Sequence, residues 1–79
     1  MGININVPVG TRLRAVTPSD DTVVGCQALY VGTTGDLAII AEGDTSAVTL
    51  VDVPVGYHPI ACYKVMAATT ADDIVAIHV

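Results

Sequence analysis

A glycine-rich stretch is the first place where this sequence could hold chemistry. Residues 28–36 read ALYVGTTGD, and glycine-rich loops that follow a strand cradle phosphates in nucleotide enzymes. A Walker-type loop needs a lysine directly after its last glycine, but Asp36 follows Gly35, and the only lysine is Lys64. The next segment, DLAIIA, resembles a strand rather than the helix that a dinucleotide site requires. We therefore expect a β-hairpin corner in which Gly32 and Gly35 supply the positive φ of a tight turn.

Acidic pairs and histidines are the candidates for a metal site. The pairs at 20–21 and 72–73 lack the DxDxDG spacing of a calcium loop, so we expect turn and capping roles, with calcium at a subunit boundary as the alternative. His58 and His78 have no companions at zinc-ligand spacing and are predicted to be surface or interface groups. The sequence thus predicts no metal and no other cofactor.

Nucleophilic side chains are few. Ser19 and Ser46 lack the GxSxG elbow of hydrolases, and no Ser-His-Asp order is evident, so the chain is predicted not to be an enzyme and to have no catalytic residues. Cys26 and Cys62 form no CxxC motif. We expect both to be reduced core residues, and a bridge between neighbouring strands is the alternative.

Composition indicates a protein that works in an assembly. The chain has 79 residues, of which 52% are hydrophobic and only 14% charged, and its mean hydropathy is +0.62. A domain this small has a high surface-to-volume ratio, so 14% charged residues cover little of its surface. Surplus apolar surface is typical of subunit interfaces, and we expect a homo-oligomer.

The charge balance excludes two classes of partner. The net charge is −5, and the basic residues are Arg12, Arg14 and Lys64. Nucleic acids and anionic membranes are bound by clustered cations, so neither is expected as a partner. No apolar run approaches the length of a membrane span, and the start, MGININVPVG, does not resemble an export signal. The chain is expected to be soluble.

Turn signals separate short runs rich in β-branched residues, which is typical of an all-β fold. We predict a compact antiparallel β-sandwich or small β-barrel of about six short strands, with residues 1–11 as an N-terminal arm and residues 12–79 as a single β-domain. The predicted strands lie near residues 12–17, 25–31, 37–42, 46–53, 59–67 and 73–79. The predicted structural turn residues are Pro18, Asp20, Gly32, Gly35, Asp36, Pro54 and Gly56.

Four residues are candidates for contact with a partner. The alternation in RLRAV places Arg12 and Arg14 on one face of a strand, where they could clamp carboxylates of a partner. The alternative is that these charges protect an edge strand from aggregation. Tyr57 and His58, in the predicted turn GYHP, are the other two candidates.

Several strings occur in an order that resembles a known family. They are RAVTPSDDT, QALYVGTTGDLAI, VTLVDVPVGYHPI and KVMAATTADDIVAIHV, which together cover nearly all of residues 14–79. This order resembles the small head-spike base proteins of gene transfer agents and their counterparts in tailed phages. The resemblance implies a β-rich virion protein on the outer capsid surface, made in the bacterial host cytoplasm, that contacts the major capsid protein.

The resemblance leaves several roles open. The protein could be a decoration or cement subunit, or a head-spike base that also carries a spike fibre protein. Three-fold and five-fold positions of an icosahedral shell would suit a trimer or a pentamer. A head-completion, tail or fibre-associated adaptor of the virion is the alternative. A carbohydrate-binding module is a third class, disfavoured because the chain has only three tyrosines and no tryptophan to stack on sugars.

Overall fold

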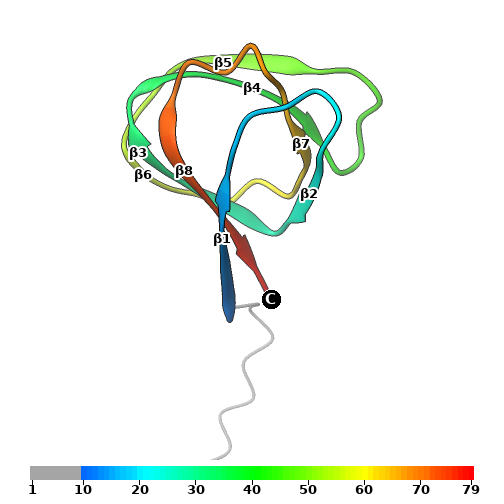
Figure 1. The fold of residues 1–79 in the computed structure, drawn as a ribbon, viewed down its shortest axis with the longest axis vertical. Helices are drawn as coiled ribbons and strands as arrows, with labels where there is room; N and C mark the ends of the chain where they lie inside the picture. The colour runs from blue at the N-terminus through cyan, green and yellow to red at the C-terminus, as the bar shows by residue number, and fades with distance from the viewer. Residues whose placement is uncertain (1–9) are drawn as a thin grey trace, which may run out of the picture.

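The computed structural model describes residues 10–79, and within this range the chain forms eight strands and no helix (Figure 1). The prediction of an all-β fold is confirmed, although eight strands replace the predicted six. Residues 1–9, most of the predicted N-terminal arm, lie outside the described residues. The strands are β1 (Arg12–Val16), β2 (Val23–Cys26), β3 (Ala28–Thr33), β4 (Gly35–Ala41), β5 (Val48–Val53), β6 (Gly56–His58), β7 (Cys62–Val65) and β8 (Asp72–His78).

The strands form two antiparallel four-stranded sheets. Sheet A has the order β1-β8-β3-β6, and sheet B has the order β2-β7-β4-β5. Every recorded ladder is antiparallel and joins strands of the same sheet, so the arrangement is a two-sheet sandwich rather than one closed barrel. Within residues 10–79 no helix is long and apolar enough to cross a membrane.

The predicted strand at 25–31 is wrong, because the chain breaks there into two strands of different sheets. Gly25 has a φ of 61°, a left-handed conformation that suits glycine and ends the regular course of β2. Gln27 then lies between β2 and β3, and its N–H donates to the carbonyl of Ile77 in sheet A at 2.9 Å. The predicted strand at 59–67 also differs: only Cys62–Val65 is extended as β7, while β6 lies earlier, at Gly56–His58.

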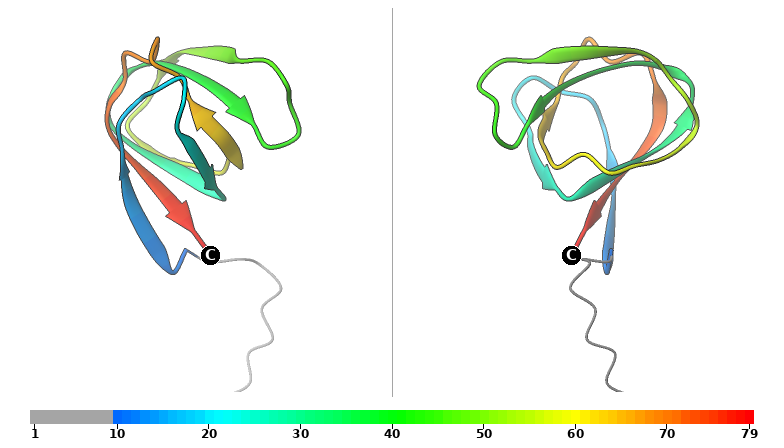
Figure 2. Two further views of the ribbon diagram at one scale, coloured as in Figure 1. Left: turned by 45° about the vertical axis from the view of Figure 1, so that its right-hand side comes forward. Right: turned by 180° about the vertical axis from the view of Figure 1, so that it is seen from behind.

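The predicted hairpin at GTTGD is also wrong. Strands β3 and β4 are separated only by Thr34, yet β3 belongs to sheet A and β4 to sheet B. The chain therefore turns a corner of the sandwich here instead of folding back on itself, as Figure 2 shows in two views. Gly25 and Gly56 are the glycines with positive φ among the described residues, so a positive φ is not the reason for glycine at positions 32 and 35.

Gly32 and Gly35 are needed because atoms of residues 70–73 come close to them. A Cβ atom built on Gly35 would lie 2.5 Å from the backbone nitrogen of Ala71, and one built on Gly32 would lie 2.6 Å from the Cβ of Asp73. The end of the β7–β8 connection approaches Gly35, and the start of β8 approaches Gly32. Both glycines remain structurally important, but through close approach rather than through a turn dihedral.

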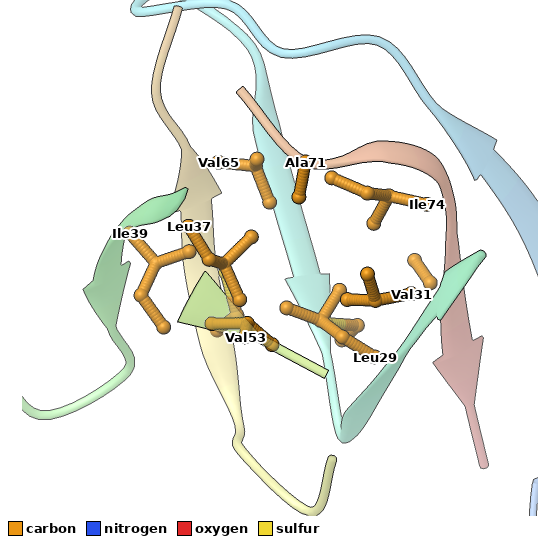
Figure 3. Close-up of a cluster of buried hydrophobic side chains, with 11 residues drawn as sticks. Leu29, Val31, Leu37, Ile39, Val53, Val65, Ala71 and Ile74 are labelled. Carbon is orange, nitrogen blue, oxygen red and sulfur yellow. The ribbon is translucent and has the colours of Figure 1, made fainter. Parts of the chain in front are cut away.

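The core lies between the two sheets (Figure 3). Leu29 and Val31 of sheet A meet Leu37 of sheet B, and all three are 0% exposed. Burial of a leucine or valine side chain contributes about 1.5–3 kcal/mol to stability. Further buried members of the cluster are Cys26, Ile39, Val53, Cys62, Val65, Ala71, Ile74 and Ala76.

Candidate interaction surfaces

The β1–β8 ladder forms a ribbon at the end of sheet A. The register runs from Arg12 opposite His78 to Val16 opposite Ile74. Figures 1 and 2 show the start of β1 and the end of β8 extending side by side out of the body of the sandwich. Side chains alternate between the two faces of a strand, so this ribbon presents two different surfaces.

One surface of the ribbon is cationic. Arg12, Arg14 and His78 line a shallow cleft of about 210 Å³. Arg12 donates from Nη2 to the carbonyl oxygen of Val79 at 3.1 Å, and Arg14 donates from Nη1 to the carbonyl oxygen of Leu13 at 3.0 Å. Neither guanidinium bonds a carboxylate side chain within residues 10–79. Each guanidinium has five N–H donors, so both retain donors for a partner's carboxylate.

The opposite surface of sheet A is apolar. The register aligns Ala15, Val75, Tyr30 and Tyr57 in one row across four strands, and Leu13 lies opposite Ile77 beside it. Directly paired residues point to the same side of a sheet, so these side chains share one face, which we name the outer face of sheet A. It includes Leu13, Ala15, Tyr30, Tyr57, Val75 and Ile77, and the buried Ala28 lies opposite Ile77 on the same side.

The six side chains named on the outer face of sheet A carry no charge, and several of them are substantially exposed. Leu13 is 63% exposed, Tyr57 62% and Tyr30 42%, whereas Leu29 and Ala76 on the reverse side of the same strands are 0% exposed. Leu13 and Ala15, which alternate with the two arginines in RLRAV, share this face. That face points away from the core, and an exposed apolar row of this kind is typical of a contact surface.

Tyr57 and His58 are separated by the structure. They are neighbours in β6 and therefore point to opposite sides: Tyr57 lies opposite Tyr30 on the outer face, and His58 lies opposite Leu29. His58 is half-buried, and its Nε2 lies 2.8 Å from the carbonyl oxygen of Pro54, to which it donates. His58 thus closes the β5–β6 connection within its own chain, while Tyr57 is available to a partner.

The predicted turn at 18–20 is anchored to strand β7 and the turn after it. The N–H of Ser19 donates to the carbonyl oxygen of Val65 at 2.9 Å. Asp20 accepts from the N–H of Ala67 through Oδ1 at 2.9 Å, and its carbonyl oxygen accepts from Lys64 Nζ at 3.2 Å. Pro18 and Asp20 therefore lie in a β1–β2 connection that is tied to the body of the protein.

Asp36 lies in strand β4 rather than in a turn. Its N–H donates to Thr70 Oγ1 at 2.8 Å, and its carbonyl oxygen accepts from the N–H groups of Thr70 and Ala71 at 2.9 and 3.1 Å. Its Oδ1 accepts from the N–H of Asp52 at 3.2 Å. Asp52 has a φ of 55°, so Asp36 supports an uncommon left-handed residue in β5.

Two predicted turn residues remain, Pro54 and Gly56. Pro54 stands between β5 and β6, and Gly56, with a φ of 135°, begins β6. Of the acidic pairs, Asp21 donates its N–H to Ser19 Oγ at 3.2 Å, and Asp73 accepts from Thr33 Oγ1 at 3.0 Å. In the part of the chain from residue 10 onward, no three His, Cys, Asp or Glu side chains are grouped to hold a metal ion.

Sequence reasoning predicted His78 as a surface or interface group, but it did not name Leu13, Ala15, Tyr30, Val75 or Ile77 as contact residues. Their position depends on the pairing of β1, β8, β3 and β6, which brings together segments far apart in the chain. The alternation in RLRAV was the available signal, since it already separated Arg12 and Arg14 from Leu13. Comparisons with models of protein families, with curated proteins and with solved structures find no match for this chain.

Proposed function

We propose that this chain is a structural virion protein on the outer capsid surface of a tailed phage or phage-like particle. In this role it binds the major capsid protein as a decoration (cement) subunit or as a head-spike base subunit. The observation that carries the proposal is the two-sided β1–β8 ribbon, with both arginines on one side and the apolar outer face of sheet A on the other. The order of the strings RAVTPSDDT, ALYVGTTGD and VDVPVGYHPI resembles that of head-spike base proteins, which is the reason for proposing a tailed phage or phage-like particle.

The outer face of sheet A is assigned to contacts between copies of the chain. Copies that each carry a net charge of −5 repel one another, so they associate most favourably through an apolar part of their surface. Leu13, Tyr30 and Tyr57 offer such a surface, and tyrosines provide large contact areas with little loss of side-chain entropy. A trimer or a pentamer would match the three-fold or five-fold positions of a shell.

The arginine face is assigned to the major capsid protein. Arg12 and Arg14 are two of only three basic residues, and they stand together on one side of β1. A pair of guanidiniums can bind two carboxylates bidentately, which fixes the orientation of the bound subunit. Charged contacts of this kind set the partner choice and the rate of association more than the affinity.

Replacement of Leu13 and Tyr57 by glutamate is expected to disrupt self-association. The Leu13→Glu/Tyr57→Glu variant should weaken the oligomer at least about 100-fold. Two apolar side chains that the proposed oligomer buries would be replaced by like charges on facing copies. Light scattering over a dilution series measures this. Val51→Glu, at a 70% exposed position of β5 in sheet B, is the matched control and should assemble as the wild type does. A monomeric wild type, or equal loss in the control, would contradict the assignment of this face.

Reversal of the arginine charges is expected to prevent binding to shells. Arg12→Glu/Arg14→Glu should lower co-sedimentation with purified capsids by about 10-fold or more, and the wild-type interaction should weaken as salt is raised. Thr45→Glu/Ser46→Glu, which adds negative charge at exposed residues of the β4–β5 turn, is the control. Cryo-microscopy of particles then locates the protein: density at the portal or tail, not on the shell, would replace this proposal with the adaptor role.

A further inference from the structure

Two cysteines face each other across the β2–β7 ladder of sheet B. Cys26 ends β2, Cys62 begins β7, and the two are register partners. Residues directly opposite in an antiparallel pair have Cα atoms about 4.5–5.5 Å apart, which lies within the roughly 4.4–6.8 Å span of disulfides. Both thiols are free and buried, and their side chains lie within hydrogen-bonding reach. The strand pairing already provides the geometry of a bridge.

The two thiols differ in their chemistry. A hydrogen bond from Cys62 lowers the pKa of Cys26 to about 7, against the opposing effect of burial and with further help from backbone N–H groups. The same hydrogen bond, together with burial, raises the pKa of Cys62. Cys62 Sγ also lies 3.1 Å from the carbonyl oxygen of Lys64, an alternative acceptor when Cys26 is neutral. Cys26 is therefore the sulfur that ionises first and acts as the nucleophile.

Strand β2 is the part of the sandwich where a disulfide would add most to local stability. It is an edge strand of four residues with β7 as its one neighbour in the sheet. Its ladder is irregular, because the register shifts between Val23 and Cys26, and Gly25 has a φ of 61°. A short edge strand with few ladder bonds opens more readily than central strands do. Local opening of β2 would admit an oxidant to Cys26.

We propose that Cys26 and Cys62 form a reversible disulfide that ties edge strand β2 to β7, with a low-molecular-weight disulfide as the oxidant. The Cys26 thiolate attacks one sulfur of the external disulfide, forms a mixed disulfide and releases one external thiolate. Cys62 then loses its proton and attacks the Cys26 sulfur, which forms the protein disulfide and releases the second external thiolate. The protein loses two electrons and two protons, and the external disulfide is reduced to two thiols.

The redox environment decides which form is present. A reducing cytoplasm keeps the pair as a dithiol, and an oxidising exterior favours the bridge. If the chain is a virion protein, the link forms after the particle leaves the cell; that timing rests on the proposed function, whereas formation of the disulfide does not. The bridge would close a loop of about 35 residues, which in the chain-entropy account removes freedom mainly from the unfolded state.

The test is oxidation of the native, purified chain in glutathione buffers, from fully reduced to fully oxidised. After acid quenching, unfolding and then alkylation, mass spectrometry should show a monomer that has lost the mass of two hydrogen atoms and carries no alkyl group. Dithiothreitol should restore two alkylatable thiols. The Tm of the oxidised protein should be higher by about 10 °C.

Cys26→Ser and Cys62→Ser are the matched variants, and each should show no oxidant-dependent change in Tm. If either fails to fold, the wild-type comparison with and without dithiothreitol still decides the matter. Two alkylatable thiols in fully oxidised buffer, disulfides only between chains, or a glutathione adduct without bridging would each overturn the proposal. A bridge that leaves the Tm unchanged would overturn its role as a tie between β2 and β7.

Discussion

Gly35→Ala is expected to lower the free energy of unfolding by about 3 kcal/mol and the Tm by on the order of 15 °C. The added Cβ would lie 2.5 Å from the backbone nitrogen of Ala71 and 2.7 Å from its Cα. Both are backbone atoms, so no side-chain rotation relieves the clash. The segment cannot move freely either, because Thr70 and Ala71 are held to Asp36 by hydrogen bonds of 2.8–3.1 Å. Gly35→Val, with a β-branched side chain, should be more severe.

Gly43→Ala is the matched control for this change. Nothing lies within 4 Å of a Cβ built on Gly43, which stands in the turn after β4. Its effect on the free energy of unfolding should be below about 1 kcal/mol, and the smaller freedom of the unfolded chain could make it stabilising. Urea denaturation of both variants measures the difference. Equal midpoints would show that residues 70–71 can move aside and that the close approach is not a constraint.

Leu37→Ala is expected to destabilise the protein by about 3–4 kcal/mol. Leu37 is 0% exposed and lies among the core side chains shown in Figure 3, where both sheets contribute. Removal of its branched end would lose the transfer free energy of three carbon atoms and leave a cavity that the two sheets cannot fully close. In a domain of this size, a loss of this magnitude is a large part of the total stability.

Leu13→Ala is the control, because it makes the same truncation at an exposed leucine and so shows whether the loss of stability depends on burial. Leu13 is 63% exposed, so the same truncation should change the free energy of unfolding by less than about 0.5 kcal/mol in dilute, monomeric protein. Thermal and urea denaturation report both variants. A loss for Leu13→Ala as large as that for Leu37→Ala, under monomeric conditions, would mean that the β1–β8 ribbon contributes to the core.

Local patterns predict the strands better than their partners. The alternation in RLRAV correctly separates the arginines from Leu13, because side-chain direction in a strand depends only on the period of two. The all-β class follows equally from β-branched runs between turn signals. The break between β2 and β3 was missed, since VVGCQALYV is apolar apart from Gly25 and Gln27, and the break depends on the left-handed φ of Gly25 and the hydrogen bond of Gln27.

The corner at GTTGD shows why the rest could not be predicted. A glycine pair between two strand-like runs indicates a hairpin, because two-residue turns are the commonest short connection. The structure instead sends β4 to the other sheet, and residues 70–73 pack over Gly32 and Gly35. That contact joins segments distant in sequence, and no local pattern encodes it. The outer face of sheet A was missed for the same reason.

The central position of β8 in sheet A affects when the protein can fold. Strand β8 pairs with both β1 and β3, so sheet A requires a strand that the ribosome makes after all the others. The β1–β8 ladder also closes a loop through almost the whole described chain, and folds with such distant pairings form in milliseconds to seconds rather than microseconds. A nascent chain that lacks β8 would lack Val75 and Ile77, and nothing would join β1 to the β3–β6 pair that carries Tyr30 and Tyr57. If copies associate through this face, as proposed, the complete contact surface exists only after synthesis has passed residue 78.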